Sequence, residues 1–300
     1  MALHAQRVAL AGGTGALGTP MLKALIEANF EVTVLTRSSG NHQFPDAAKV
    51  VSVDYANAES LRQALRGQDA LISTITTSAI DQQKSLFDAA IASGVQRLIP
   101  SEFGCDIIHP KSRALPVYSQ KVEMEEYLKE RCKGTKSTYT FVFNNVFLDW
   151  GIDHQFLIDL KGKRVELYDG GDQCYTATPL AFVAKGTVAV LQHAEETANR
   201  AVRLHGTSLS QTRLLKIAQK VLGEQGWHVS EASTEKIEKS SYEVLKNDPG
   251  NLMGWAVGFL KRAIFADGYG GDFSANNDNA LLGLEELTAK DVEEMVRSRV

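Results

Sequence analysis

A glycine-rich turn near the start of the chain constrains its fold more than any other feature of the sequence. A short apolar run at residues 8–11 leads directly into the glycine-rich segment 12–18. Apolar residues then recur at helical spacing over residues 20–28. This order predicts a buried strand, a tight turn and a helix, which is how a βαβ unit begins.

Short apolar runs and helical segments continue to alternate up to Trp150. The order of elements follows from length and composition, because β-branched runs of four residues indicate strands and longer periodic segments indicate helices. Strands are predicted at residues 32–35, 50–53, 70–73, 97–100 and 140–143. Helices are predicted at 59–65, at 82–93 between an Asp81 cap and Gly94, and at 119–131. The alternation predicts an α/β fold with a doubly wound parallel sheet.

The second half of the chain lacks this regular pattern. We predict a strand at residues 165–168 and a helix that begins at Thr178 with Pro179 in its first position. Further helices are predicted at 212–222 and from Thr288 to the end, where Asp291 completes a capping box. These segments suggest a smaller α/β cap over residues 151–300, part of which returns to the main sheet.

Composition narrows the possible partners. The formal net charge of the 300 residues is -4, which gives no reason to expect binding to nucleic acid or to an anionic membrane. No apolar stretch is long enough to span a bilayer, and the three cysteines have no CxxC spacing that would indicate a zinc site or a disulfide framework. We expect a cytoplasmic monomer or homodimer that binds a small molecule and no metal.

The three glycines of the turn suit a bound pyrophosphate. Gly12, Gly15 and Gly18 follow the GxxGxxG pattern, with Thr14, Ala16 and Leu17 between them. Glycines let backbone amides approach phosphate oxygens closely, at the positive end of the following helix. Ordinary packing of a strand on a helix also uses glycine turns, but the position after the first predicted strand favours a dinucleotide. We therefore expect a Rossmann-type domain over residues 1–150.

The residues after the second strand favour NADP(H) over NAD(H). Proteins that prefer NAD(H) place a carboxylate there, whereas this chain has Arg37 and Ser38. A guanidinium offers paired donors to a 2′-phosphate, although a solvated loop arginine is the alternative. Thr74, at the end of the fourth strand, is expected to line the cofactor.

Polar residues after the fifth and sixth strands are candidates for the reaction site. Ser101, Glu102 and Phe103 follow the fifth strand. Phe103 could pack beside the nicotinamide or belong to the core. Glu102 could orient neighbouring polar groups or be a helix cap or a surface charge. Asn144 and Asn145 follow the sixth strand, where their amides could bind a carboxamide or serve a turn.

Lys121 is the candidate general acid or base and a candidate cofactor-binding residue, since a lysine in a partly dry crevice can transfer a proton or hold the nicotinamide ribose, although single lysines are usually solvated. Typical short-chain dehydrogenases carry tyrosine and lysine at i and i+4. Here Tyr118 precedes Lys121 by three residues, so we favour Lys121 and hold Tyr118 in reserve.

Several aromatic residues belong to the region expected to cover the crevice. They could contact an aromatic substrate or fill a core. The candidates for substrate contact are Phe103, Phe147, Trp150 and Tyr269, with Tyr168 as a further aromatic residue of the same region.

These motifs together resemble the isoflavone reductase-like, or NmrA-like, family of atypical short-chain dehydrogenases. The resemblance rests on the glycine turn, Thr36-Arg37, the run from Gln83 through Gly94 to Arg97, the segment 100–104 (PSEFG) and Lys121. It implies that the glycines and Arg37 hold NADPH, that Gln83 and residues 143–147 lie at the cofactor or substrate, and that Lys121 is the general acid or base. The chain departs from the plant pattern after Gly104, and residues 147–151 look more like microbial members.

The sequence thus predicts an NADPH-dependent reductase that transfers a hydride to a small aromatic or conjugated acceptor. The main alternative is a non-catalytic NADP(H) sensor of the same family, which would not need Lys121. A sugar-nucleotide epimerase-like enzyme should carry the i, i+4 tyrosine and lysine pair, which is absent here.

Overall fold

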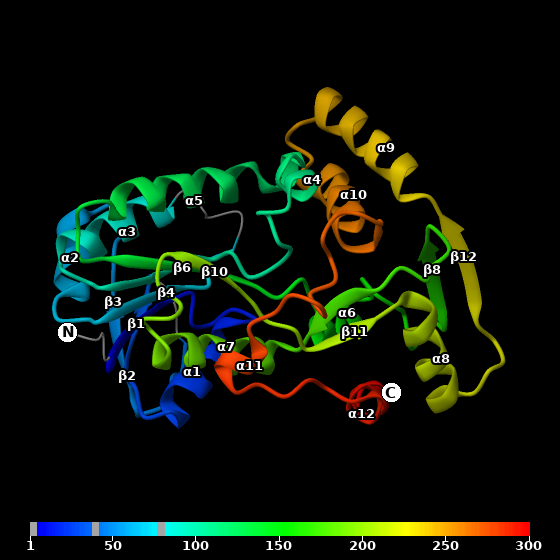
Figure 1. Cartoon of the computed structure of the whole chain (residues 1–300), viewed down its shortest axis with the longest axis horizontal. Helices are drawn as coiled ribbons and strands as arrows, with labels where there is room; N and C mark the ends of the chain where they lie inside the picture. Colours follow the sequence, from blue (N-terminus) through cyan, green and yellow to red (C-terminus); the bar gives the residue numbers. More distant parts are fainter. Residues whose placement is uncertain (1–4, 38–41, 77–81) are drawn as a thin grey trace.

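The computed structural model describes residues 5–37, 42–76 and 82–300. Its main element is a seven-stranded sheet with the order β10-β6-β5-β4-β1-β2-β3, in which every neighbouring pair is parallel (Figure 1). This order reverses direction between β1 and β4, as in doubly wound nucleotide-binding folds. The strands are β1 (Arg7–Ala11), β2 (Glu31–Thr36), β3 (Ala48–Ser52), β4 (Ala70–Ser73), β5 (Arg97–Ile99), β6 (Thr138–Phe143) and β10 (Arg200–Arg203).

Alternate residues of these strands face two separate helical layers. In β1, Ala9 and Ala11 belong to one hydrophobic cluster, whereas Val8 and Leu10 belong to the other. One layer contains α2 (Ala58–Leu65), α3 (Gln82–Ala92) and α5 (Ser119–Cys132). The other contains α1 (Gly18–Glu27) and α7 (Leu180–Gln192), with α11 (Asn279–Leu282) packed on α7. The predicted α/β fold with a parallel, doubly wound sheet is therefore confirmed.

Strand β10 and helix α7 come from the second half of the chain, yet they complete the main sheet and its outer layer. Arg97 of β5 lies fully buried beneath this addition. Its guanidinium donates to Thr140 and Thr197 at 2.9 Å each and to the backbone oxygen of Ala194. These bonds join β5, β6 and the segment that leads into β10.

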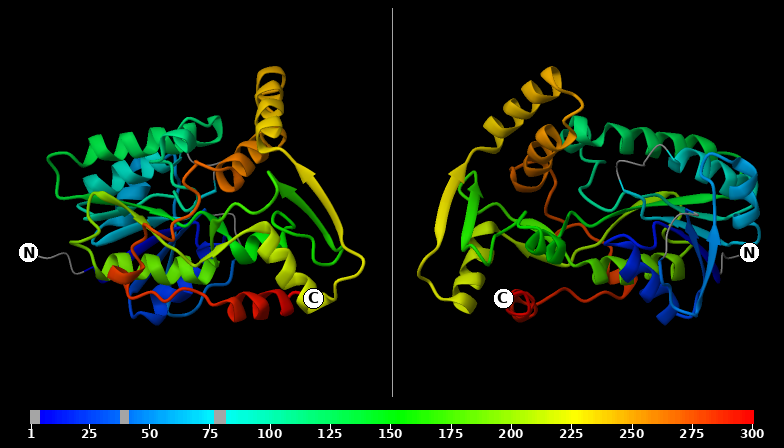
Figure 2. Two further views of the ribbon diagram at one scale, coloured as in Figure 1. Left: turned by 45° about the vertical axis from the view of Figure 1, so that its right-hand side comes forward. Right: turned by 180° about the vertical axis from the view of Figure 1, so that it is seen from behind.

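The remaining segments form a second region at the end of the molecule opposite the N-terminus (Figure 2). Its two small sheets have the orders β11-β9-β7 and β12-β8. The strands are β7 (Val146–Phe147), β8 (Arg164–Tyr168), β9 (Tyr175–Thr178), β11 (Thr207–Leu209) and β12 (His228–Ala232). The other helices are α4 (Pro110–Arg113), the 3₁₀ turn η2 (Pro116–Tyr118), α6 (Leu148–Asp153), α8 (Gln211–Leu222), α9 (Thr234–Asn247), α10 (Leu252–Phe265) and α12 (Ala289–Arg297).

The predicted start of the helix at Thr178 is wrong. Thr178 ends strand β9, where it pairs with Phe147, and its hydroxyl donates to the backbone oxygen of Asn144 at 2.8 Å. Pro179 has an extended backbone (ψ 149°) and is the N-cap of α7, not its first helical residue. Strand pairing thus extends through Thr178, so the first residue of α7 is Leu180 and not Pro179.

Two other helix starts in this region follow local capping. The capping box of Thr288 and Asp291 is confirmed, although α12 ends at Arg297 and not at Val300. Helix α8 begins one residue before the predicted Thr212, because the Ser210 hydroxyl accepts from the backbone N–H of Arg213. The Asp81 cap predicted for α3 lies outside the described residues.

Helices α9 and α10 were not predicted, although each has a local starting signal. Ser233 caps α9 and Asn251 caps α10 by accepting from backbone N–H groups of the first turn. The two helices form a hairpin, and α10 packs on η2 (Figures 1 and 2). Among the described helices, none is long and apolar enough to cross a membrane.

Candidate functional site

The glycine turn has no room for side chains at its first and last glycine. Gly12 adopts a positive φ of 83°, and a Cβ there would lie 2.8 Å from the backbone of Thr74. A Cβ on Gly18 would lie 2.8 Å from the backbone of both Gly12 and Gly13. A Cβ on Gly15 would meet only the Gly12 oxygen, at 3.4 Å. The turn is therefore closed tightly by Gly12 and Gly18, and Gly15 is the glycine with free space beside it.

Thr74 locks this turn to the neighbouring strand. Its backbone N–H donates to Ala11 at 2.9 Å, and its hydroxyl lies 3.0 Å from the backbone oxygens of both Ala11 and Gly12. The hydroxyl is thus engaged with the turn itself. Thr74 shapes the surface on which a cofactor would lie, and direct contact with the cofactor stays a prediction.

Helix α1 begins directly at the turn. Leu17 occupies the N-cap position, and no side chain caps the first turn. Thr14 and Ala16 are exposed, whereas the Leu17 side chain is buried in the core. An anion at this position would therefore bind to the backbone N–H groups of the segment, at the positive end of the helix dipole.

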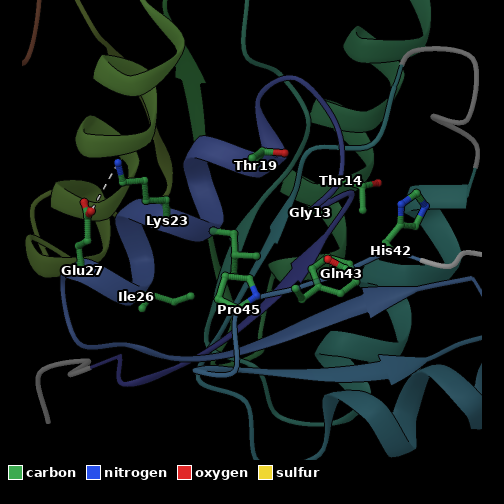
Figure 3. A pocket seen from close by; sticks show the side chains of 11 residues that line it. Gly13, Thr14, Thr19, Lys23, Ile26, Glu27, His42, Gln43 and Pro45 are labelled. Atoms are coloured by element: carbon green, nitrogen blue, oxygen red, sulfur yellow. Dashed lines mark ion pairs between the residues drawn. The ribbon is translucent and has the colours of Figure 1, made fainter.

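A cleft of about 510 Å³ runs from the turn along α1 (Figure 3). Thr14 and His42 lie at one end of it, and Lys23, Ile26 and Glu27 line the other end. His42 was not among the predicted site residues. Its position after β2, facing the glycine turn, adds a polar group to the region where Arg37 is predicted to bind a 2′-phosphate. Arg37 itself is exposed, and Ser38 lies outside the described residues.

The loops after β4 and β5 are tied together at the carboxyl edge of the sheet. The backbone N–H of Ser101 donates to Gln83 Oε1 at 2.9 Å, and the Ser101 hydroxyl donates to the Ile75 oxygen at 2.8 Å. Gln83 is fully buried, and its Nε2 has no hydrogen-bond partner among the described residues. Gln83 and Ser101 therefore hold the loops after β4 and β5 in place. Their contact with a cofactor stays a prediction.

Lys121 lies in the first turn of α5 and points back to the loop after β5. Its Nζ donates to the backbone oxygen of Glu102, and a Cβ on Gly104 would lie 3.7 Å from the same nitrogen. The Lys121 side chain is half-buried. The fold thus brings the Lys121 side chain to the carboxyl edge of the sheet.

The Glu102 side chain is almost completely buried beside this lysine. The pKa of the Glu102 carboxyl is raised to about 8, mainly by burial and with a contribution from Glu125, against the lowering effect of Lys121 and Arg113. Glu125 lies four residues after Lys121 on α5 and receives a hydrogen bond from Arg113 at 2.8 Å. Glu125 and Arg113 were not predicted, although the i, i+4 spacing from Lys121 was visible in the sequence.

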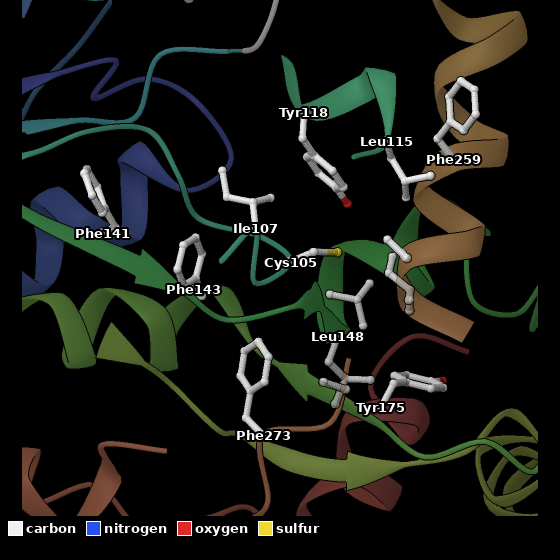
Figure 4. Close-up of a cluster of buried hydrophobic side chains, with 14 of the residues drawn as sticks. Cys105, Ile107, Leu115, Tyr118, Phe141, Phe143, Leu148, Tyr175, Phe259 and Phe273 are labelled. Atoms are coloured by element: carbon white, nitrogen blue, oxygen red, sulfur yellow. The ribbon is translucent and has the colours of Figure 1, made fainter. Parts of the chain in front are cut away.

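Tyr118 lies in the core beside Cys105 (Figure 4). Both side chains are buried, and burial raises the pKa of the Tyr118 phenol well above its usual value and that of the Cys105 thiol to about 11. A tyrosine with a lowered pKa is what the tyrosine and lysine mechanism of typical short-chain dehydrogenases requires. The raised pKa of Tyr118 is the opposite of this requirement.

Asn144 and Asn145 have different hydrogen-bonding situations. Asn145 has a positive φ of 51°, and its Nδ2 donates to the backbone oxygens of Thr176 at 3.1 Å and Gly271 at 2.7 Å. Its Oδ1 accepts from Cys105, so its amide is used within the protein. The buried Oδ1 of Asn144 has no partner among the described residues. Of the two amides, Asn144 is the one with an open acceptor.

The predicted aromatic residues do not gather around one pocket. Phe103 and Phe147 belong to the hydrophobic cluster of the α1 and α7 layer. Trp150 stacks on His154 with ring centroids 4.2 Å apart. Tyr269 belongs to the other cluster, with the Arg262 guanidinium 4.8 Å from its ring. Tyr168 stacks on Phe265 in the same cluster. Core packing is thus the role that the structure shows for Phe103, Phe147, Tyr168 and Tyr269, whereas the half-buried Trp150 stacks on the exposed His154.

The chain is similar over most of its length to one protein family. The model of the NmrA-like family matches residues 4–239. Oxidoreductase aprR of Aspergillus flavus is 33% identical over 297 residues, which cover 97% of this chain and 98% of the relative.

Solved structures share the whole fold. The complex of leucoanthocyanidin reductase from Vitis vinifera with NADPH has a TM-score of 0.80 and 20% identity, and the match covers 98% of this chain and 99% of that one. A structure of AtPrR2 with NADP+ and (+)-pinoresinol has a TM-score of 0.72 and 21% identity, and it covers 99% of both chains. At this level of identity the likeness shows a common architecture.

Proposed function

Because the chain belongs to the NmrA-like family, we propose that it is an oxidoreductase that binds NADP(H) at the glycine turn and uses Lys121 to transfer a proton. The observation that carries this proposal is the position of the half-buried Lys121 at the carboxyl edge of the sheet, against the loop after β5. Its relative aprR is named an oxidoreductase, and leucoanthocyanidin reductase was solved with NADPH.

The residues of the turn fit a dinucleotide. The backbone passes Gly12 and Gly18 so closely that a Cβ at either would collide with it, and the N-cap residue Leu17 makes no side-chain hydrogen bond to the first turn of α1. Such a cradle accepts a pyrophosphate through backbone N–H groups. We assign Gly12, Thr14, Gly15 and the backbone of residues 16–18 to the pyrophosphate and Arg37 with Ser38 to the 2′-phosphate, and we add His42. The other residues of the proposed cofactor site mostly shape its walls. They are Thr74, Gln83, Ser101, Glu102, Phe103, Asn144 and Asn145.

NADPH would supply the hydride in this site. A hydride transferred to a conjugated or carbonyl carbon leaves negative charge on a neighbouring atom, which must then receive a proton. Lys121 can donate that proton, because its Nζ is held at the edge of the sheet by the Glu102 oxygen and faces the glycine at position 104. In the reverse direction the neutral amine would accept a proton.

A small aromatic or conjugated acceptor is the proposed substrate class. The structure of AtPrR2, which shares this fold, contains (+)-pinoresinol. Phe147 and Trp150 are half-buried and follow β6 and Asn144 in the chain, so they retain exposed surface for a substrate. Tyr269 and Phe103 are buried and would need to move to make contact.

Cofactor preference is tested by binding of NADPH and NADH to the wild type and to Arg37→Ala, measured by calorimetry. Loss of charge-assisted hydrogen bonds worth about 1.5–3 kcal/mol predicts an NADPH affinity about 10–100-fold weaker, with NADH binding changed little. Arg66→Ala is the control, because Arg66 is an exposed arginine at the end of α2. Equal weakening of both cofactors, or none, would remove Arg37 from the 2′-phosphate site.

Activity is tested by NADPH consumption with a panel of aromatic enones, ketones and benzylic ethers. Lys121→Met should lower turnover by about 10²–10⁴-fold, the usual contribution of general acid catalysis, while NADPH affinity is kept. Lys136→Met, at an exposed loop position, should behave as the wild type. Tight NADPH binding without turnover of any compound would favour the non-catalytic sensor.

A further inference from the structure

Asn145 lies between segments that are far apart in the chain. It follows β6 with a positive φ of 51°, and the residue is 2% exposed. Its Nδ2 donates to two backbone oxygens, that of Thr176 in β9 at 3.1 Å and that of Gly271 at 2.7 Å. Its Oδ1 accepts from Cys105 Sγ at 3.2 Å. Both hydrogens of the Asn145 amide are therefore used to join β9 to the segment after α10.

The loop after β5 is held on one side by Asn145 and on the other by Lys121. The Gly104 oxygen accepts from the backbone N–H of Asn145 at 2.9 Å, and the thiol of Cys105 donates to the Asn145 side chain. Two residues before Gly104, the Glu102 oxygen accepts from Lys121 Nζ. This stretch of the loop thus connects the lysine amine to the asparagine through a short length of backbone with hydrogen bonds at both ends.

The segment 266–272 follows α10 and contacts the Asn145 amide. The Ser112 hydroxyl donates to the Tyr269 oxygen in this segment at 2.6 Å. Ser112 belongs to α4, which leads through η2 into α5 and therefore to Lys121. The segment is thus attached to both parts of the chain that determine where the lysine lies. It reaches the loop after β5 through Asn145 and the approach to α5 through Ser112.

We infer that Asn145 is a positioning residue, which fixes the loop that binds Lys121 Nζ and holds this loop against segment 266–272. The inference rests on the proposed function, in which Lys121 transfers a proton. Proton transfer needs the nitrogen within hydrogen-bond reach of the reacting atom, and a displacement of about 1 Å can lower a rate about 10²-fold. Without the Asn145 carboxamide, the Glu102 oxygen and the lysine amine that it binds lose their fixed position relative to the segment.

Two substitutions remove the amide donor of Asn145 in different ways, so that the test stays open if one variant does not fold. Asn145→Gly deletes the carboxamide and lets the backbone keep its positive φ, which glycine adopts readily. Asn145→Asp has the same size and keeps an oxygen for Cys105, but it has an acceptor in place of the donor to Thr176 and Gly271. Asn29→Gly is the matched control, because Asn29 also has a positive φ, of 62°, but is exposed after α1.

The state of the Lys121 amine is measurable without any substrate. Trace acetylation of the full-length protein, quantified for each lysine by mass spectrometry, reports how reactive each amine is. Asn145→Gly should increase the acetylation of Lys121 roughly 2–10-fold, as expected for the loss of one hydrogen bond, and Asn145→Asp should do the same. Asn29→Gly should leave it at the wild-type level.

Lys129 distinguishes a local change at Lys121 from a general loosening of α5. It lies further along the same helix, where its Nζ donates to Glu126 at 3.0 Å. Its acetylation should stay unchanged in Asn145→Gly. An equal increase at Lys129 and Lys121, or no increase at Lys121 in a folded variant, would overturn the inference.

Turnover gives the second readout, with whichever panel compound the wild type reduces. Asn145→Gly should lower kcat about 10–100-fold, while NADPH affinity stays within about threefold of the wild type. Because Asn145 acts through Lys121, the same substitution in Lys121→Met should cause little further loss, and losses that multiply would contradict the proposal. If the wild type reduces no compound, the proposed function fails, while the acetylation result still decides whether Asn145 positions Lys121.

Discussion

Gly18 and Gly15 have different structural roles in the same turn, and alanine substitutions can distinguish these roles. A methyl group in Gly18→Ala would collide with the backbone of Gly12 and Gly13, so we expect about 1–3 kcal/mol lower stability toward urea and loss of NADPH binding. Gly15→Ala meets no atom closer than 3.4 Å and should keep wild-type stability while weakening NADPH binding at least tenfold. Wild-type stability of Gly18→Ala would show that the turn can relax.

Single residues also show what the sequence could and could not predict about the site. The glycine positions were predictable because they follow from local backbone geometry, and the placement of Lys121 followed from its spacing after the fifth strand. The pairing of Arg113 with Glu125 was not predictable, because the two residues come from different helices that meet only in the folded chain. The aromatic residues were assigned to the substrate from their position in the chain, yet Tyr269 packs against Arg262 in the core.

The segment between α10 and α12 is fastened by a buried histidine that should make stability depend on pH. The Thr176 hydroxyl accepts from the Phe273 N–H at 2.7 Å and is hydrogen-bonded to His205 Nδ1 at 2.8 Å. Burial lowers the pKa of His205, although Glu286 and Asp272 oppose this. The unfolded chain therefore binds the proton first, and the stability is complete above about pH 6.5 and falls as pH drops toward the folded pKa.

Urea unfolding at pH 7 and pH 5 measures this contribution. The wild type should be less stable at pH 5, and His205→Gln, which keeps an acceptor for Thr176, should lose part of that difference. His154→Gln is the control, because His154 is exposed. An unchanged pH dependence in His205→Gln would mean that the histidine is protonated without cost in the folded protein.

Among the elements, those of the first half were predictable because short parallel strands with helices between them leave a regular pattern. The small sheets of the second half were harder to predict. Strand β9 has neighbours on both sides, one before it and one after it in the chain, and this pairing overrides the local proline signal at Pro179. Helices α9 and α10 do have local signals in the sequence, since Ser233 and Asn251 cap their first turns.

The main sheet takes its last strand and much of one helical layer from residues beyond 150, which bears on the proposed domain boundary. We expect the fragment 1–150 to be insoluble or partly unfolded, because it lacks α7 and β10, which cover the hydrophobic cluster beside α1 and the edge of β6. Circular dichroism and cooperative unfolding of this fragment, compared with the full chain, provide the measurement. A monomeric, cooperatively unfolding fragment would establish residues 1–150 as an independent domain.

Because β10 is synthesised after β6, the chain leaves the ribosome with the edge of β6 still unpaired. Strand β6 ends at Phe143 and its neighbour begins at Arg200, so at about 5–20 residues per second the edge of the sheet stays open for several seconds. An open edge invites pairing with other nascent chains. During that interval Arg97 has neither Thr197 nor Ala194 to bind and remains a hydrated cation near the open edge. The same arginine that later joins three segments can thus discourage aggregation while the protein is being made.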